Sequence, residues 1–70
     1  MTDTQIKATL TRNGIKTLEL DKECIVVTID LDFGWVEKME WFERFIEREG
    51  FRKEFAHVIA NNRVCIACRR

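Results

Sequence analysis

The N-terminal segment alternates apolar and polar residues one by one. Within residues 6–11, Ile6, Ala8 and Leu10 are separated by single polar residues. A period of two residues is typical of a strand with one buried face. Leu18 and Leu20 repeat the pattern a few residues later, so this part of the chain predicts two antiparallel strands.

The connection between these strands decides whether their apolar residues share a face. A two-residue turn at Asn13 and Gly14 would place the two apolar sets on opposite faces of the hairpin. A three-residue loop over 12–14 instead pairs Ala8 with Leu18, with Gly14 as the left-handed residue of a bulge. The three-residue loop is therefore predicted.

Residues 23–31 form the strongest strand pattern in the chain. Ile25, Val26, Val27 and Ile29 are all β-branched and occupy both parities of the segment. β-branched residues favour strands, and a strand that is apolar on both faces is expected at the centre of a sheet. Asp21 begins the turn that precedes it.

A helix is predicted from Asp32 to Gly50. Asp32 is a suitable N-cap residue. Gly50 suits the left-handed position after a helix, and Phe51 supplies the apolar contact that accompanies such an end.

The apolar stripe of this helix is wider than one packing surface requires. Its core-facing positions are Trp35, Met39, Phe42 and Ile46. Trp41 and its i+4 neighbour Phe45 extend the apolar arc to about 160°, against about 100° for an ordinary surface helix. The surplus predicts a second surface, which is either the C-terminal segment of the same chain or a partner.

The last twenty residues fit two patterns. Phe51, Phe55, Val58 and Ile59 fit a helical spacing, whereas the Asn61-Asn62 turn signal between two strand-like segments fits a hairpin. We favour a hairpin over residues 55–69 and keep a second short helix over residues 51–60 as the alternative.

These elements predict one α+β domain over residues 1–70. Its antiparallel sheet would consist of a β-meander and a C-terminal hairpin, in the order β-β-β-α-β-β, with one amphipathic helix packed on one face. The predicted core residues are Ile6, Leu10, Leu18, Leu20, Ile25, Val27, Ile29, Trp35, Met39, Phe42, Ile46 and Ile59.

The chain has no net charge, but its charges are unevenly distributed. Residues 30–50 carry a net charge of −4, and residues 51–70 carry a net charge of +4. A neutral chain is not typical of a nucleic-acid-binding protein, which usually shows a basic excess. The polar residues 1–7 lack the apolar core of a secretory signal, and three cysteines are an odd set for a disulfide framework. We therefore expect a cytoplasmic location, with no membrane association.

The candidates for chemistry are few. Cys24, His57, Cys65 and Cys68 are zinc-ligand types, but Cys65 and Cys68 on one strand would point to opposite faces. Whether they bind metal stays open, and no cofactor or metal site is predicted. Asp30 and Asp32 have simpler roles at a strand end and a helix start, so the chain is not expected to be an enzyme.

Two functional hypotheses remain. The first is a non-enzymatic protein-interaction module, a homodimer or a small inhibitor or regulator of the kind frequent among phage and mobile-element proteins. Its partner-binding residues would be Trp41, Phe45, Glu37, Arg48 and Arg44. The alternative is a nucleic-acid-binding protein. Its binding residues would be Arg52, Lys53, Arg63, Arg69 and Arg70.

Overall fold

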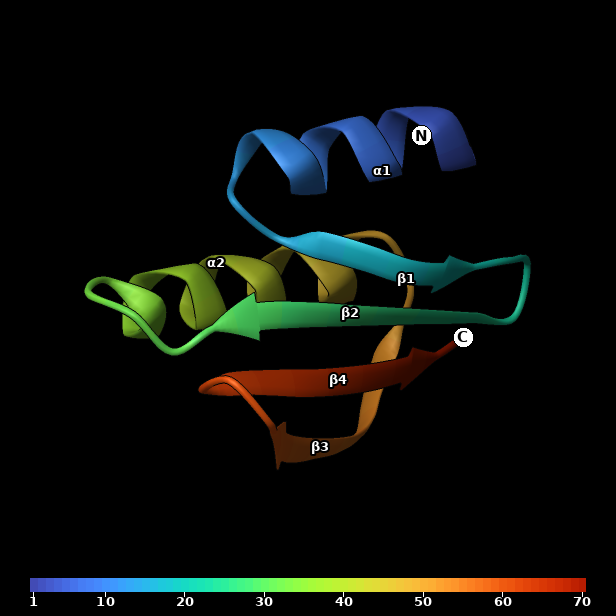
Figure 1. Cartoon of the computed structure of the whole chain (residues 1–70). Coiled ribbons are helices and arrows are strands. Elements are labelled where there is room, and N and C mark those ends of the chain that lie inside the picture. Colours follow the sequence, from blue (N-terminus) through green and yellow to red (C-terminus); the bar gives the residue numbers. More distant parts are fainter.

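The computed structural model describes residues 1–70 and contains two helices and four strands (Figure 1). In chain order these are α1 (Asp3–Arg12), β1 (Lys16–Leu20), β2 (Cys24–Asp30), α2 (Trp35–Arg48), β3 (Arg52–Ile59) and β4 (Arg63–Arg69). The strands form one antiparallel sheet in the order β1-β2-β4-β3. The predicted α+β class is confirmed, but the first element is a helix, so the order is α-β-β-α-β-β.

The N-terminal segment forms α1 because two reciprocal hydrogen bonds, a capping box, hold its first turn. The Thr2 hydroxyl accepts a hydrogen bond from the Gln5 backbone N–H at 3.2 Å, and the Gln5 side chain accepts one from the Thr2 N–H at 2.9 Å. Ile6 and Leu10 are four residues apart, so helical spacing also brings them to one face, and both are buried. The strand predicted over residues 6–11 is wrong, because the capping box at Thr2 and Gln5 starts a helix.

The hairpin loop predicted at 12–14 is wrong for the same reason. Gly14 does adopt the left-handed conformation, with φ +75°, but it follows the C-terminus of α1. Its backbone N–H donates to the Thr11 carbonyl at 3.1 Å, and the Ile15 N–H donates to Leu10 at 2.9 Å. These bonds satisfy carbonyl groups at the helix end.

The central position of β2 is confirmed, since it lies between β1 and β4. The β1–β2 register is interrupted, with Thr17 opposite Val27 and Glu19 opposite Val26. Leu18 is thereby left out of the ladder and is 54% exposed. Its predicted place in the core is wrong.

The start of α2 differs from the prediction, whereas its end agrees with it. The N-cap is Gly34, in the left-handed conformation and without a side-chain cap, so the capping role predicted for Asp32 is wrong. The C-terminal end is confirmed: the Gly50 N–H donates to Glu47 at 3.1 Å and the Phe51 N–H donates to Ile46 at 2.8 Å. This pair of bonds is a Schellman motif.

The predicted C-terminal hairpin is confirmed, and its first strand is longer than expected, beginning at Arg52. Asn61 and Asn62 both adopt left-handed conformations at its turn, with φ +66° and +52°. Asparagine tolerates this conformation better than other non-glycine residues. The turn is held to the β2–α2 connection, because the Leu31 N–H donates to the Asn62 carbonyl at 2.7 Å.

β2, α2 and β3 form a split β-α-β unit. β2 and β3 are both antiparallel to β4, which lies between them, so they are parallel to each other. Placing β4 before α1 in the chain would give the β-α-β-β-α-β order of ferredoxin-like folds.

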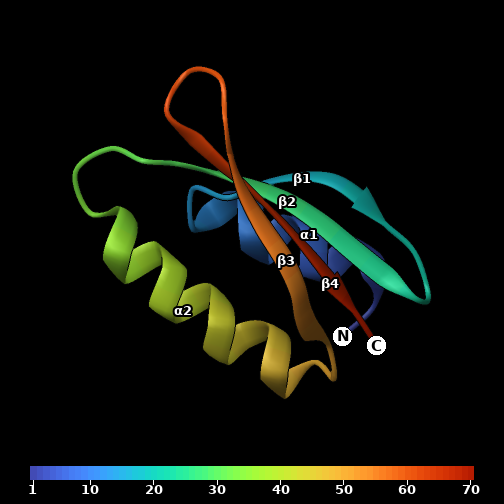
Figure 2. The same ribbon diagram turned by 90° about the horizontal axis from the view of Figure 1, so that it is seen from below.

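The core lies on one face of the sheet, between β2, β4 and the helices (Figure 2). Along β2 and β4, residues of one parity are buried against the helices: Ile25, Val27 and Ile29 from β2, and Val64, Ile66 and Cys68 from β4. No helix is long and apolar enough to span a bilayer.

Candidate functional site

The aromatic pair expected to bind a partner is largely used inside the domain. Trp41 and Phe45 stack with their ring centroids 5.0 Å apart. Phe45 is only 1% exposed and belongs to the core, and Trp41 is half-buried against it. The division into core and surplus aromatics is therefore wrong for Phe45.

The segments at the two ends of α1 border the side of α2 that carries Trp41 and Phe45. Lys38, Trp41, Phe45 and Glu49 lie along one side of α2 at helical spacing. At one end of this row, the Met1 amino group lies 3.6 Å from the Glu49 carboxylate. At the other, the Lys38 side chain lies against Gly14, the residue that follows α1. Packing within the chain accounts for the extra width.

The polar residues predicted beside this pair stay on the surface. Glu37, Arg44 and Arg48 are exposed on α2. The Arg48 guanidinium lies 5.7 Å from the centroid of the Phe45 ring and covers its outer side. Arg48 thus shields an aromatic core residue.

Apolar side chains at the start of α2 and in the loop before it are exposed. Trp35, predicted to be in the core, is 41% exposed at the first turn of α2, and Val36 beside it is also exposed. Phe33 is fully exposed in the preceding loop. Of these three side chains, Phe33 is uncovered and the other two are partly covered.

The basic residues proposed for nucleic-acid binding all lie on the terminal hairpin or next to it, and most have partners. Lys53 contacts Glu43 at 3.0 Å, Arg63 contacts Asp30 at 3.0 Å, and Arg69 contacts Glu54 at 3.2 Å.

Of the other two basic residues, Arg70 stacks its guanidinium on the Phe51 ring, 4.5 Å from the ring centroid. Arg52 makes no ion pair. The hairpin therefore presents less uncompensated positive charge than its sequence indicates.

The sheet has a second face that no helix covers, here called the open sheet face (Figure 2). Its centre consists of small or β-branched side chains: Val26 and Thr28 from β2, and Cys65 and Ala67 from β4. The ion pairs Asp30–Arg63 and Glu54–Arg69 lie towards its two ends.

β3 supplies the exposed border of this face. Registers with β4 place Phe55 opposite Ala67, His57 opposite Cys65 and Ile59 opposite Arg63. Phe55 and His57 contact each other with ring centroids 4.9 Å apart.

Every residue of β3 is exposed, on both faces. β3 is an edge strand, so the backbone N–H and C=O groups on its outer side have no strand to pair with. Val58, which points toward the helix side, is 74% exposed because α2 does not extend over it. The segment Phe55–Ile59 therefore combines free backbone groups with uncharged, mostly apolar side chains.

β1, the other edge strand, is protected against pairing. It has only five residues, its ladder is interrupted at Leu18, and it carries the charges of Lys16 and Glu19. Short length, irregularity and charge are the usual devices that prevent edge-to-edge association. β3 has its charges and its irregularity only at its start, between Arg52 and Phe55.

The four residues of zinc-ligand type, Cys24, His57, Cys65 and Cys68, do not form one group. Cys68 is buried on the helix side of β4, whereas Cys65 lies on the open sheet face, next to His57. The expectation that Cys65 and Cys68 point to opposite faces is confirmed. Burial raises the pKa of the Cys68 thiol to about 11, which keeps it protonated.

Cys24 lies in a different group, with Glu19 and Asp21 near the β1–β2 turn. Burial and the nearby Asp21 raise the pKa of the Cys24 thiol. Asp21 accepts hydrogen bonds from the Glu23 and Cys24 backbone N–H groups at 2.8 and 2.9 Å, which lower its pKa. These bonds give Asp21 a structural role in the turn.

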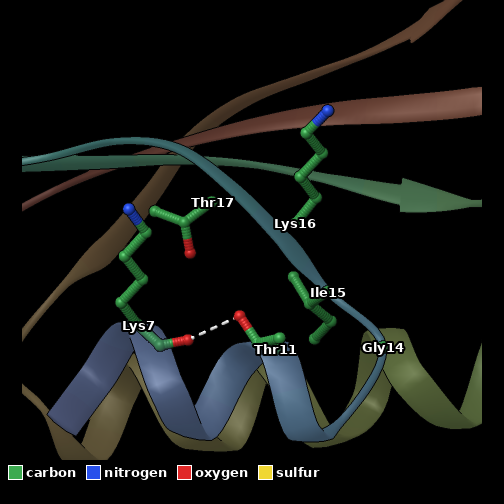
Figure 3. Close-up of a pocket in the computed structure, with 6 residues that line it drawn as sticks. All are labelled: Lys7, Thr11, Gly14, Ile15, Lys16 and Thr17. Carbon is green, nitrogen blue, oxygen red and sulfur yellow. Dashed lines mark hydrogen bonds between the residues drawn. The ribbon is translucent and has the colours of Figure 1, made fainter. Parts of the chain in front are cut away.

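An open depression of about 450 Å³ lies between α1 and β1 (Figure 3). Figure 3 shows Lys7 and Lys16 at its opposite ends and the Thr11 hydroxyl bonded to the Lys7 carbonyl, at 3.0 Å. The Thr17 hydroxyl is buried without a hydrogen-bond partner and points toward α1. The two ammonium groups do not converge, so the depression lacks the arrangement of a binding site.

Comparison of the chain with protein-family models, with curated proteins and with solved structures finds no match.

Proposed function

We propose that this chain is a non-enzymatic protein-interaction module that binds an extended protein segment along β3. The observation that supports the proposal is an eight-residue edge strand whose residues are all exposed and whose second half carries no charge. An added strand would satisfy the free backbone groups, and its alternate side chains would contact Phe55 and Ile59 on the open sheet face. In the cell, such a module would act as a small regulator or inhibitor in the cytoplasm.

β3 is proposed as the partner-binding site in place of the α2 surface around Trp41 and Phe45, because β3 is more accessible. Phe45 is in the core and Trp41 is half-buried against it, so the pair offers a partner little accessible surface. β3 needs no rearrangement to accept a strand. Edge-strand addition uses main-chain hydrogen bonds for affinity and side-chain pockets for specificity.

Selection from a library of random short peptides tests the proposal. We expect enriched peptides to alternate apolar and polar residues, and their binding to shift backbone amide NMR signals of β3. Val58→Lys places a charge on the edge and should weaken peptide binding by about tenfold or more. Val36→Lys, the same substitution at an exposed valine on α2, is the matched control and should bind as wild type does.

The nucleic-acid alternative is tested in parallel with single-stranded DNA and RNA oligonucleotides. Phosphate contacts would give an affinity that falls steeply with salt concentration. Such a slope, together with the absence of peptides that map to β3, would overturn the proposal.

A further inference from the structure

We propose that the strand bound at β3 is β3 of a second copy of this chain, paired antiparallel with His57 at the two-fold axis. This inference rests on the proposed function and names its partner. It makes the protein a homodimer whose two sheets join into one continuous sheet. The register between the two copies of β3 follows from the symmetry, from the charges at the start of β3 and from its uncharged segment Phe55–Ile59.

Symmetry limits the registers that are possible. Two antiparallel edge strands related by a two-fold axis have that axis perpendicular to the sheet, so both open sheet faces lie on the same side. Directly opposite residues share a face of the sheet. Each residue must therefore face one of its own parity, and the axis must pass beside a single residue of β3.

Charge then excludes the registers whose axis lies at the start of β3. Arg52, Lys53 and Glu54 occupy the start of β3, and no charged residue follows before Arg63. An axis at Glu54 would place the two Glu54 carboxylates opposite each other, and an axis at Lys53 would do the same with two ammonium groups. Like charges directly opposite destabilise a strand pair.

An axis at His57, the midpoint of the uncharged segment Phe55–Ile59, avoids these contacts and pairs that segment along its whole length. Phe55 faces Ile59 of the other copy on the open sheet face, and Ala56 faces Val58 on the helix side. Val58, which is 74% exposed, gains a neighbour. The charged residues lie opposite the turn of the other copy, beyond the paired segment.

The paired segment is short, because the β3–β4 ladder is irregular between Lys53 and Phe55. α2 contacts β3 near its start, through Lys53 and Glu43, and leaves Phe55–Ile59 free for a second strand. A ladder of this length predicts a reversible dimer that forms at micromolar to millimolar concentrations, as small interfaces do.

Sedimentation equilibrium over this concentration range tests the dimer. Wild type and Val36→Lys should dimerise with the same affinity. Val58→Lys and His57→Arg should weaken the dimer by about tenfold or more, because each brings charge to the joined edge. Circular dichroism of each variant checks that the fold is retained, which is expected since the replaced side chains are exposed.

Disulfide trapping tests the register. The background is Cys24→Ala with Cys65→Ala, which leaves only the buried Cys68. His57→Cys would face its own copy at a Cα separation of about 4.5 to 5.5 Å, within disulfide range. Val58→Cys faces position 56 instead, so it should form the covalent dimer several times more slowly.

The possible outcomes separate this inference from the proposed function. A monomer at all concentrations overturns the self-pairing, and equal cross-linking at positions 57 and 58 overturns the register with His57 at the axis. If the protein is monomeric but selected peptides still map to β3, the proposed function stands and its partner is a foreign protein. If neither peptides nor a second copy bind β3, both proposals fail.

Discussion

Phenylalanine occupies opposite environments within one short segment of this chain. Phe42 and Phe45 are buried, whereas Phe33, in the loop before α2, is fully exposed. The hydrophobicity of the residue is identical in each case, so only its position decides whether it contributes to stability.

Phe42→Ala should lower the free energy of unfolding by about 3 to 5 kcal/mol, because it leaves a cavity among well-packed neighbours. That is a large share of the stability of a small domain, so urea unfolding should show a partly unfolded protein even without denaturant. Phe33→Ala is the matched control and should change the free energy by less than about 0.5 kcal/mol. Equal effects would show that the core is misassigned.

At the scale of the elements, local sequence signals predicted the ends of some elements and not of others. The Schellman motif at the end of α2 could be predicted from Gly50, because glycine is the residue that best tolerates the required left-handed conformation. The start of α1 was missed because Ile6 and Leu10 fit both a period of two and an i,i+4 spacing. Thr2 and Gln5 carried the deciding signal, a capping box.

Gly50→Ala isolates the backbone contribution at the end of α2. A Cβ at this position would contact nothing within 4 Å, and φ is +86°. The variant should therefore lose about 1 to 2 kcal/mol through left-handed strain alone. Gly50→Asn should lose less, and thermal unfolding of the three proteins would reveal the order. A more stable alanine variant would contradict this explanation.

At the scale of the whole molecule, the sheet separates a helix-covered face from the open sheet face. Cys68 and Cys65 both lie on β4, Cys68 on the helix-covered face and Cys65 on the open sheet face. The difference between them is a direct test of this arrangement.

In a Cys24→Ala variant, a disulfide reagent at mildly alkaline pH should modify Cys65 rapidly. Cys68, whose thiol pKa is raised to about 11 by burial, should react only as fast as the domain unfolds, since the thiolate is the reactive form. Mass spectrometry of peptides identifies the modified residue. Modification of Cys68 at the rate of Cys65 would place β4 in a different orientation.

The sequence by itself determined the features that depend on neighbours along the chain. These are the central strand β2, the body and C-terminal end of α2, the Asn61-Asn62 hairpin and the α+β class. Each follows from periodicity or from the conformational preference of one residue type.

Only the tertiary structure decided which apolar surfaces are covered. Phe45, from the wide apolar arc of α2, joins one core cluster with Ile6 and Leu10 of α1, a helix that the alternating pattern did not predict. β3 is left at the edge because β4 pairs between it and β2. Strand order and helix placement depend on contacts between residues far apart in the sequence, and local patterns do not encode which of several similar surfaces meets another.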